Sequence, residues 1–204
     1  MPIRPPLKLG FLASHGGSAM RAVLGAIAAG ELSAEARVLI TNNRDCGAVA
    51  GAEAAGLPWK HISSSSEGSA EAADAAMAEA LAAAGAELVV LSGYMRKLGP
   101  RTLERFAGRI LNIHPALLPC HGGQGLYGRR VHEAVHASGD AVSGASIHLV
   151  DAGYDTGPVI ARAEVPVRPG DGVDDIEARV RAVEPGLMVE TLRKIAAGEL
   201  VLPA

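Results

Sequence analysis

Short apolar runs alternate with longer alanine-rich stretches through the first half of the chain. Such alternation is typical of parallel βαβ units, in which each strand is followed by a helix that crosses back over the sheet. We expect strands at Leu7–Ala13, Arg37–Thr41, Trp59–Ile62, Glu87–Ser92 and Ile110–Ile113. We expect helices between them at Ser18–Ala29, Cys46–Ala55, Ser69–Ala84 and Pro100–Phe106.

A glycine follows each of these expected helices, at Gly30, Gly56, Gly85 and Gly108. Glycine commonly ends a helix because it adopts the left-handed conformation without steric cost. Since crossovers between parallel strands are right-handed, the pattern predicts a Rossmann-like α/β fold. Its core would be an open, mostly parallel, twisted sheet with helices on both faces.

The second half of the chain has a different pattern. A Gly-rich segment is followed by an expected helix at Val131–Ala137, strands at Ala145–Val150 and Val159–Pro166, and a last helix at Val173–Ala197. Pro185 and Gly186 should kink or interrupt that last helix. The segment from 63 to 69 is interpreted as a polar connection. The length fits a single domain over residues 1–204.

Charge and composition exclude several classes of partner. The net charge is −3 and no basic run is present, which disfavours a nucleic-acid partner. No apolar run is long enough for a membrane span or the core of a signal peptide. With only Cys46 and Cys120, we expect reduced thiols in a cytoplasmic protein, as a monomer or homodimer.

A Gly-rich turn, SHGGS at residues 14–18, lies between the first expected strand and helix. Backbone amides and the positive end of the helix could there converge on a phosphate. The segment matches neither GxGxxG nor GxxxxGK[ST], so it does not indicate a dinucleotide or a nucleoside triphosphate. The alternative is a plain tight turn in which Ser18 is the N-cap of the helix.

The segment ILNIHPALLP places Asn112 and His114 two residues apart at the end of an apolar strand. Both side chains should therefore leave the same face of the sheet, at the strand ends where open α/β sheets build their sites. An imidazole can exchange protons near neutral pH, and an amide can donate to an oxygen that gains charge. Asp155, in DAGYDTGPVI, could orient His114 and favour its protonated form. Together these residues suit acyl-type transfer, although each also fits a structural role.

The sequence HEAVH at residues 132–136 matches H-E-x-x-H, a motif that binds zinc when it lies on a helix. Val142 stands where the extended motif needs a third histidine. We therefore expect no metal, and the zinc peptidase remains a remote alternative. We expect His61, His132, His136 and His148 to be structural or solvated, with His148 bordering the site.

Nearly the whole chain resembles the folate-dependent formyltransferases, most specifically through NIHPALLP and HLVDAGYDTGPVI. The resemblance implies transfer of the formyl group of 10-formyltetrahydrofolate, as co-substrate, to the glycine amine of 5-phosphoribosyl-glycinamide in purine biosynthesis. It implies that Asn112 and protonated His114 stabilise the oxyanion, and that Asp155 raises the pKa of His114.

The resemblance also assigns binding residues. Those for the phosphorylated acceptor are Gly17, Ser18, Ala19, Met20 and Glu184. Those for the reduced folate are Met95, Arg96, Lys97, Leu98, Asn112, Asp151, Ala152, Gly153, Tyr154 and Asp155.

The chain departs from the family pattern at several positions. Ala19 replaces a usual Asn, His15 a common Gly, and Pro185 a frequent His. The stretch from 66 to 70 has no basic residue for the glutamate tail of the folate. A longer Gly-rich segment, Cys120–Arg130, follows the strand, and we expect Arg129 and Arg130 to be available for phosphate contacts.

Besides the zinc peptidase, three other functions remain open: another formyltransferase, a hydrolase and a binding module. Other formyltransferases or hydrolases use the same donor, but those relatives generally carry an extra domain, which we do not expect here. A non-catalytic nucleotide-binding module would keep the first Gly-rich turn, with no need for Asn112, His114 and Asp155 together.

Overall fold

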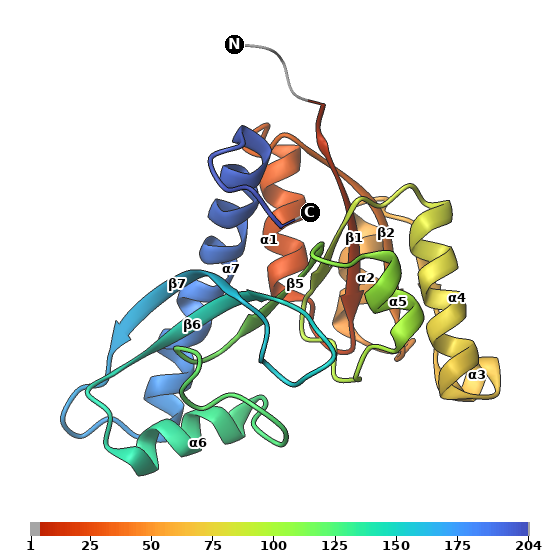
Figure 1. Cartoon of the computed structure of the whole chain (residues 1–204). Helices are drawn as coiled ribbons and strands as arrows, with labels where there is room; N and C mark the ends of the chain where they lie inside the picture. The colour runs from red at the N-terminus through yellow and green to blue at the C-terminus, as the bar shows by residue number, and fades with distance from the viewer. Residues whose placement is uncertain (1–4, 204) are drawn as a thin grey trace.

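Seven strands of the described chain form one sheet in the order β3-β2-β1-β4-β5-β6-β7 (Figure 1). The computed structural model describes residues 5–203. The first five strands pair in parallel, while β6 is antiparallel to both β5 and β7. The strands are β1 (Leu7–Ala13), β2 (Ala34–Thr41), β3 (Trp59–His61), β4 (Leu88–Leu91), β5 (Ile110–His114), β6 (Val142–Leu149) and β7 (Val159–Pro166).

Helices cover both faces of the sheet (Figure 1). Contacts within the apolar core place α1, α2 and α7 on one face and α4 and α5 on the other. The helices are α1 (Ser18–Ala28), α2 (Gly47–Ala54), α3 (Ser64–Glu67), α4 (Ala70–Ala83), α5 (Pro100–Arg105), α6 (Arg129–Ser138) and α7 (Val173–Ala197). The predicted α/β fold is thus confirmed, with a mostly parallel sheet between two helical layers.

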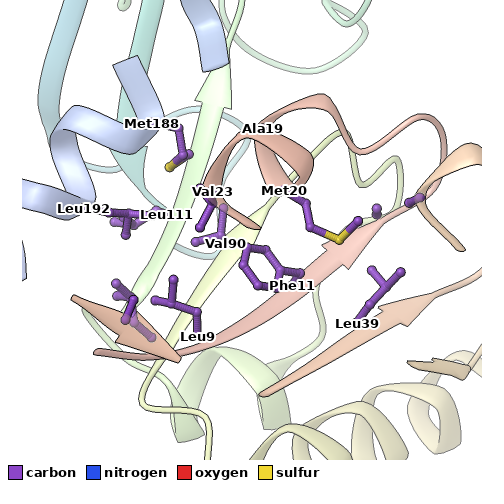
Figure 2. Close-up of a cluster of buried hydrophobic side chains, with 14 of the residues drawn as sticks. Leu9, Phe11, Ala19, Met20, Val23, Leu39, Val90, Leu111, Met188 and Leu192 are labelled. Carbon is purple, nitrogen blue, oxygen red and sulfur yellow. The ribbon is translucent and has the colours of Figure 1, made fainter. Parts of the chain in front are cut away.

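The central strands are apolar on both sides, as parallel strands between two helical layers must be. Leu9 and Phe11 of β1 point into the cluster under α1, where Met20 and Val23 meet them (Figure 2). Leu12, the residue after Phe11, points into the opposite cluster. Alternating directions along one buried strand therefore tie both helical layers to the same sheet.

The predicted helix stops are confirmed. Gly30, Gly56, Gly85 and Gly108 all have positive φ, between 65° and 72°. Each follows the end of the helix that it was expected to terminate.

Some element boundaries differ from those predicted. β2 begins at Ala34 and β6 at Val142, each three residues earlier than expected, because pairing with a neighbouring strand extends them through less apolar residues. The expected polar connection contains the short helix α3, which Ser63 caps by accepting from the backbone N–H of Ser66 at 3.1 Å. Ser-rich sequence thus formed a capping box instead of an irregular loop.

The predicted interruption of the last helix is wrong, because α7 runs continuously from Val173 to Ala197 with Pro185 inside it. Proline removes one intrahelical donor, which is a local loss. Both halves of the helix are anchored: Ile176 and Val180 pack in one buried cluster, and Met188 packs in another. Tertiary packing therefore outweighs the local preference of the proline.

No helix within residues 5–203 combines the length and the apolar composition needed to cross a membrane. Both cysteines are free thiols, with Cys46 buried and Cys120 exposed.

Candidate active site

Three loops meet at the carboxyl ends of the parallel strands. β5 ends with Asn112 and His114 beside β4. The loops after β1 and β4 are joined, because Ser14 donates its backbone N–H to the carbonyl of Gly93 at 3.1 Å and its Oγ accepts from the N–H of Met95 at 2.9 Å. Open parallel sheets bind ligands at this edge.

His114 is buried and has both ring nitrogens in defined surroundings. Its Nε2 lies 2.8 Å from the backbone carbonyl oxygen of His121, an acceptor only, so Nε2 carries a proton. Its Nδ1 lies 3.5 Å from Oδ2 of Asp155. In the neutral imidazole, Nδ1 is therefore the basic atom and it faces the carboxylate.

Asp155 is held in an unusual backbone conformation, with φ of 55°. Its Oδ2 accepts the backbone N–H of Gly123 at 3.0 Å, which links the 151–157 loop to the Gly-rich segment after β5. Burial acts to raise the pKa of Asp155, but the adjacent imidazoles of His148 and His114 and the backbone N–H of Gly123 outweigh it and hold the pKa below its usual value. The carboxylate is therefore ionised at neutral pH.

The pKa of His114 lies below its ordinary value of 6.5 because burial disfavours the charged imidazole, even though Asp155 acts to raise it. Asp155 therefore acts on the pKa of His114 in the expected direction, upwards. This influence is outweighed by burial, so the resting His114 is neutral at pH 7.

His148 lies inside this cluster, whereas the sequence placed it only at the border. Its Nδ1 lies 2.9 Å from the carbonyl oxygen of Leu149, and its Nε2 lies 3.0 Å from Nδ2 of Asn112. The same Nε2 is 3.4 Å from Oδ1 of Asp155. One imidazole thus contacts both the amide and the carboxylate of the predicted trio.

A signal for His148 exists in the sequence. In SIHL, Ser146 and His148 are two residues apart, so in a strand they share a face, as Asn112 and His114 do. The antiparallel register then pairs Asn112 with His148 and His114 with Ser146. Strand pairing, which sequence alone did not supply, was needed to bring the two pairs together.

The Gly-rich turn leads directly into α1. Gly17, with φ of 61°, is the N-cap, and Ser18 is already helical, so the alternative role of Ser18 as N-cap is wrong. The N–H of Met20 donates to Oγ of Ser92 at 3.0 Å. The amides of Ser18 and Ala19 lie in the first helical turn, where no intrahelical acceptor is available, so they can serve an anion.

Glu184 lies on α7, which packs along α1. Its neighbour Pro185 and Ala22 of α1 line one groove between the two helices. Burial raises the pKa of Glu184 to about 7, with Glu177 adding to the rise and Arg181 opposing it. Its carboxyl group is therefore poised between charged and neutral forms near physiological pH.

The two segments expected to bind the folate lie next to each other. The ammonium of Lys97 sits 5.1 Å from the ring centre of Tyr154, a cation–π contact that joins the loops. Asp151 holds its own loop through Oδ1, which accepts from the N–H of Gly153 at 2.9 Å and from Oγ1 of Thr156 at 2.6 Å.

Both arginines at the end of the Gly-rich segment, Arg129 and Arg130, contact other side chains of the protein. Arg129 pairs with Asp174, Glu133 and Glu177 and so joins α6 to α7. The guanidinium of Arg130 lies 5.1 Å from the ring centre of Tyr127. The structure therefore does not place Arg129 as a free phosphate ligand, because acidic side chains of α6 and α7 neutralise it.

The H-E-x-x-H motif does not present two histidines to a common open site. His132 is buried, with its Nδ1 unpartnered within the described chain, whereas His136 is exposed. Among residues 5–203, no group of three or more His, Cys, Asp or Glu side chains is placed to hold a metal ion. The helix instead packs His132 toward the acidic and basic residues of α7.

Known proteins share this fold and sequence. The formyl transferase family profile matches residues 7–192. The phosphoribosylglycinamide formyltransferase of Mycobacterium tuberculosis is 41% identical over 196 residues, which cover 96% of this chain and 88% of that protein. The crystal structure of glycinamide ribonucleotide transformylase 1 from Symbiobacterium toebii superposes with a TM-score of 0.90 at 36% identity, covering 98% of this chain and 92% of that one.

A longer plant relative matches over part of its length. The chloroplastic phosphoribosylglycinamide formyltransferase of Vigna unguiculata is 35% identical over 194 residues, and the match spans 95% of this chain but 62% of that protein.

Proposed function

The chain belongs to the formyl transferase family, and we propose that it transfers the formyl group of 10-formyltetrahydrofolate to the glycine amine of 5-phosphoribosyl-glycinamide. The observation that carries this proposal is the contact of His114 Nδ1 with Asp155 Oδ2, 3.5 Å apart, beside Asn112 at the end of β5. The activities named for the relatives from M. tuberculosis and S. toebii support the choice of acceptor.

His114 acts as the proton carrier in the proposed reaction. As the acceptor amine attacks the formyl carbon, the amine nitrogen becomes positively charged and must lose a proton. Neutral His114 accepts it at Nδ1, because Nε2 already donates to the carbonyl of His121. The ionised Asp155 stabilises the imidazolium, which then returns the proton to the folate nitrogen as its bond to carbon breaks.

Asn112 supplies a donor for the oxygen of the formyl group. That oxygen gains negative charge when the carbon becomes tetrahedral, and a half-buried, preorganised amide donor stabilises the charge without reorganisation. One Nδ2–H of Asn112 is bound to His148. The other remains for the substrate.

The acceptor would be held by its phosphate and its ribose. We assign the phosphate to the amides of Gly17, Ser18 and Ala19 at the start of α1, where the helix dipole favours an anion. Met20 contributes through packing, since its N–H is bound to Ser92. Glu184, on the adjacent α7, is assigned to the ribose or the glycine amine.

The folate would lie between the loops joined by Lys97 and Tyr154. Backbone groups of 95–98 and 151–155 are assigned to its ring system, with Asn112 and Asp155 next to the formyl group. We further propose that residues 1–204 act as one domain, in the cytoplasm, as a monomer or homodimer without a nucleic-acid or membrane partner.

The test is an acceptor panel with the purified chain and 10-formyltetrahydrofolate. The loss of the formyl donor is followed by absorbance, with 5-phosphoribosyl-glycinamide, methionyl-tRNA or no acceptor present. We expect turnover only with the phosphoribosyl acceptor. Equal turnover without acceptor would indicate a hydrolase, and no turnover with tight phosphate-ligand binding would indicate a binding module.

A further inference from the structure

We propose that His148 is a positioning residue: it fixes the orientation of the Asn112 carboxamide, so that an N–H and not the carbonyl oxygen of that amide is presented to the formyl group. This inference rests on the proposed function, because the formyl oxygen is the group that the amide would meet. It assigns to His148 a task carried out through Asn112.

The backbone fixes which nitrogen of His148 carries the proton. Its Nδ1 lies 2.9 Å from the carbonyl oxygen of Leu149, which can only accept. A neutral imidazole has a single N–H, so this contact places it on Nδ1 and leaves a lone pair on Nε2. The side chain is only 3% exposed, so water does not replace the backbone acceptor.

The lone pair on Nε2 selects one of the two orientations of the Asn112 amide. Nδ2 of Asn112 lies 3.0 Å from Nε2 and donates to it. A flipped amide would place Oδ1 against the lone pair, losing a partly buried hydrogen bond and setting two acceptors in contact. With the amide held, its second N–H lies in the plane of the carboxamide and is free for a substrate oxygen.

Asp155 offers His148 an alternative contact. Its Oδ1 lies 3.4 Å from the same Nε2, and that atom can donate to Asp155 only when the ring takes a second proton. A protonated Nε2 would then face the donor group of Asn112 and favour the flipped amide. The charged or titratable groups that act on the ring are Asp155, from the 151–157 loop, and His114, from β5. Of the two contacts of Nε2, the one to Asn112 is the shorter, and it is the one that uses a lone pair on Nε2.

The first experiment is a double-mutant cycle on formyl transfer. His148→Leu removes both polar contacts, whereas His148→Gln keeps an acceptor for Asn112 and a donor for Leu149. We expect His148→Leu to lower kcat by about tenfold to hundredfold with KM nearly unchanged, and His148→Gln to recover most of the loss. Adding His148→Leu to Asn112→Ala should cause no further loss, because both changes remove the same interaction.

The control is Thr191→Val, which removes a buried hydroxyl that donates to the carbonyl of Leu187, on α7. It should leave kcat unchanged, so that generic loss of a buried polar group is separated from loss of amide positioning. Two results would overturn the inference. One is a double variant whose loss of kcat equals the product of the losses of His148→Leu and Asn112→Ala. The other is a kcat of His148→Gln as low as that of a folded His148→Leu.

The second experiment needs no variant and no turnover. Nitrogen-15 NMR of the wild-type protein reports which ring nitrogen of each histidine bears the proton. We expect the Nδ1–H form for His148 and a coupling across the Asn112 Nδ2–H···Nε2 hydrogen bond. Finding His148 protonated on Nε2 at neutral pH would overturn the inference. An inactive wild-type protein with the expected spectrum would instead count against the proposed function alone.

Discussion

Oδ2 of Asp155 lies 3.5 Å from Nδ1 of His114, although one residue precedes β7 and the other ends β5. The N–H of Gly123 holds the same carboxylate oxygen at 3.0 Å. The 151–157 loop and the Gly-rich segment after β5 therefore together fix the distance between the carboxylate of Asp155 and the imidazole of His114. The contact partly offsets the burial of His114, which on balance lowers its pKa.

Replacing Asp155 by Asn should move the pH dependence of kcat to lower pH. Turnover needs neutral His114, so kcat falls as the pH drops through the pKa of His114. Asp155 acts to raise that pKa, and its loss lowers the pKa further. The kcat profile of Asp155→Asn should show this shift together with a lower plateau. Asp45→Asn, in an exposed loop, is the control. If kcat of the wild type and of both variants falls at the same acidic pH, Asp155 does not influence the pKa of His114.

Replacing His132 by Leu should make the fold less sensitive to acid. Burial holds the pKa of His132 below 6.5, and its Nδ1 has no partner in the described chain. The unfolded chain therefore binds a proton more readily than the folded one, and stability is lost as the pH falls below about 6.5. His132→Leu should reduce the difference in unfolding free energy between pH 7 and pH 5. His114 shares the same sign, so part of the acid sensitivity should remain.

Urea titrations at the two pH values measure that difference. The control is His136→Leu, on the exposed side of the same helix. If both variants lose stability in acid as steeply as the wild type, burial of His132 is not a source of the acid sensitivity.

Replacing Glu184 by Gln should stabilise the protein at alkaline pH and not in acid. The folded pKa of about 7 exceeds the ordinary 4.5, so stability falls as the pH rises from about 4.5 to 7. A shift of that size corresponds to about 3 kcal/mol. The Tm of Glu184→Gln should exceed that of the wild type at pH 8 and match it near pH 4.5. A constant difference at both pH values, or a gain shared by the exposed Glu190→Gln, would contradict the assignment.

The sequence predicted most of the strands of the sheet, because the position of a strand depends mainly on the local pattern of apolar residues. Apolar runs located the seven strands, and glycines located the helix ends. Continuity of α7 through Pro185 was not predictable, because it depends on packing at Ile176 and Met188, far apart on the helix. The tendency of proline to break a helix is outweighed where the helical segments on both sides of the proline pack in the core.

The sequence named Asn112, His114 and Asp155 and expected Asp155 to orient His114, but it did not supply the backbone geometry that brings them together. Their meeting depends on the antiparallel register of β6 and on the left-handed backbone of Asp155. That register also brings His148 into the cluster. The neutral state of His114 was likewise hidden, because burial is a property of the folded chain.

Replacing Gly17 by Ala should weaken both the fold and acceptor binding. Its φ of 61° is unfavourable for alanine, and an added Cβ would lie 2.9 Å from that of Ala48. Gly30 also has positive φ, at 71°, but has open space around it. Gly30→Ala should therefore cost only the backbone term, about 1 kcal/mol, and Gly17→Ala roughly 1 to 3 kcal/mol more.

Thermal unfolding and the KM for the acceptor measure these two effects. Only Gly17→Ala should raise the KM, because α1 would shift at its first turn. Equal destabilisation by the two variants would show that the contact with Ala48 does not limit this turn.

Single-turnover formyl transfer in His114→Ala and Asn112→Ala, with enzyme in excess over 10-formyltetrahydrofolate and with saturating 5-phosphoribosyl-glycinamide, tests the site most directly. Each side chain handles charge that develops only during transfer, so each variant should be slower than wild type by about two to three powers of ten, with acceptor binding little changed. Wild-type rates in either variant, or losses confined to acceptor binding, would contradict the placement of the reaction at the end of β5.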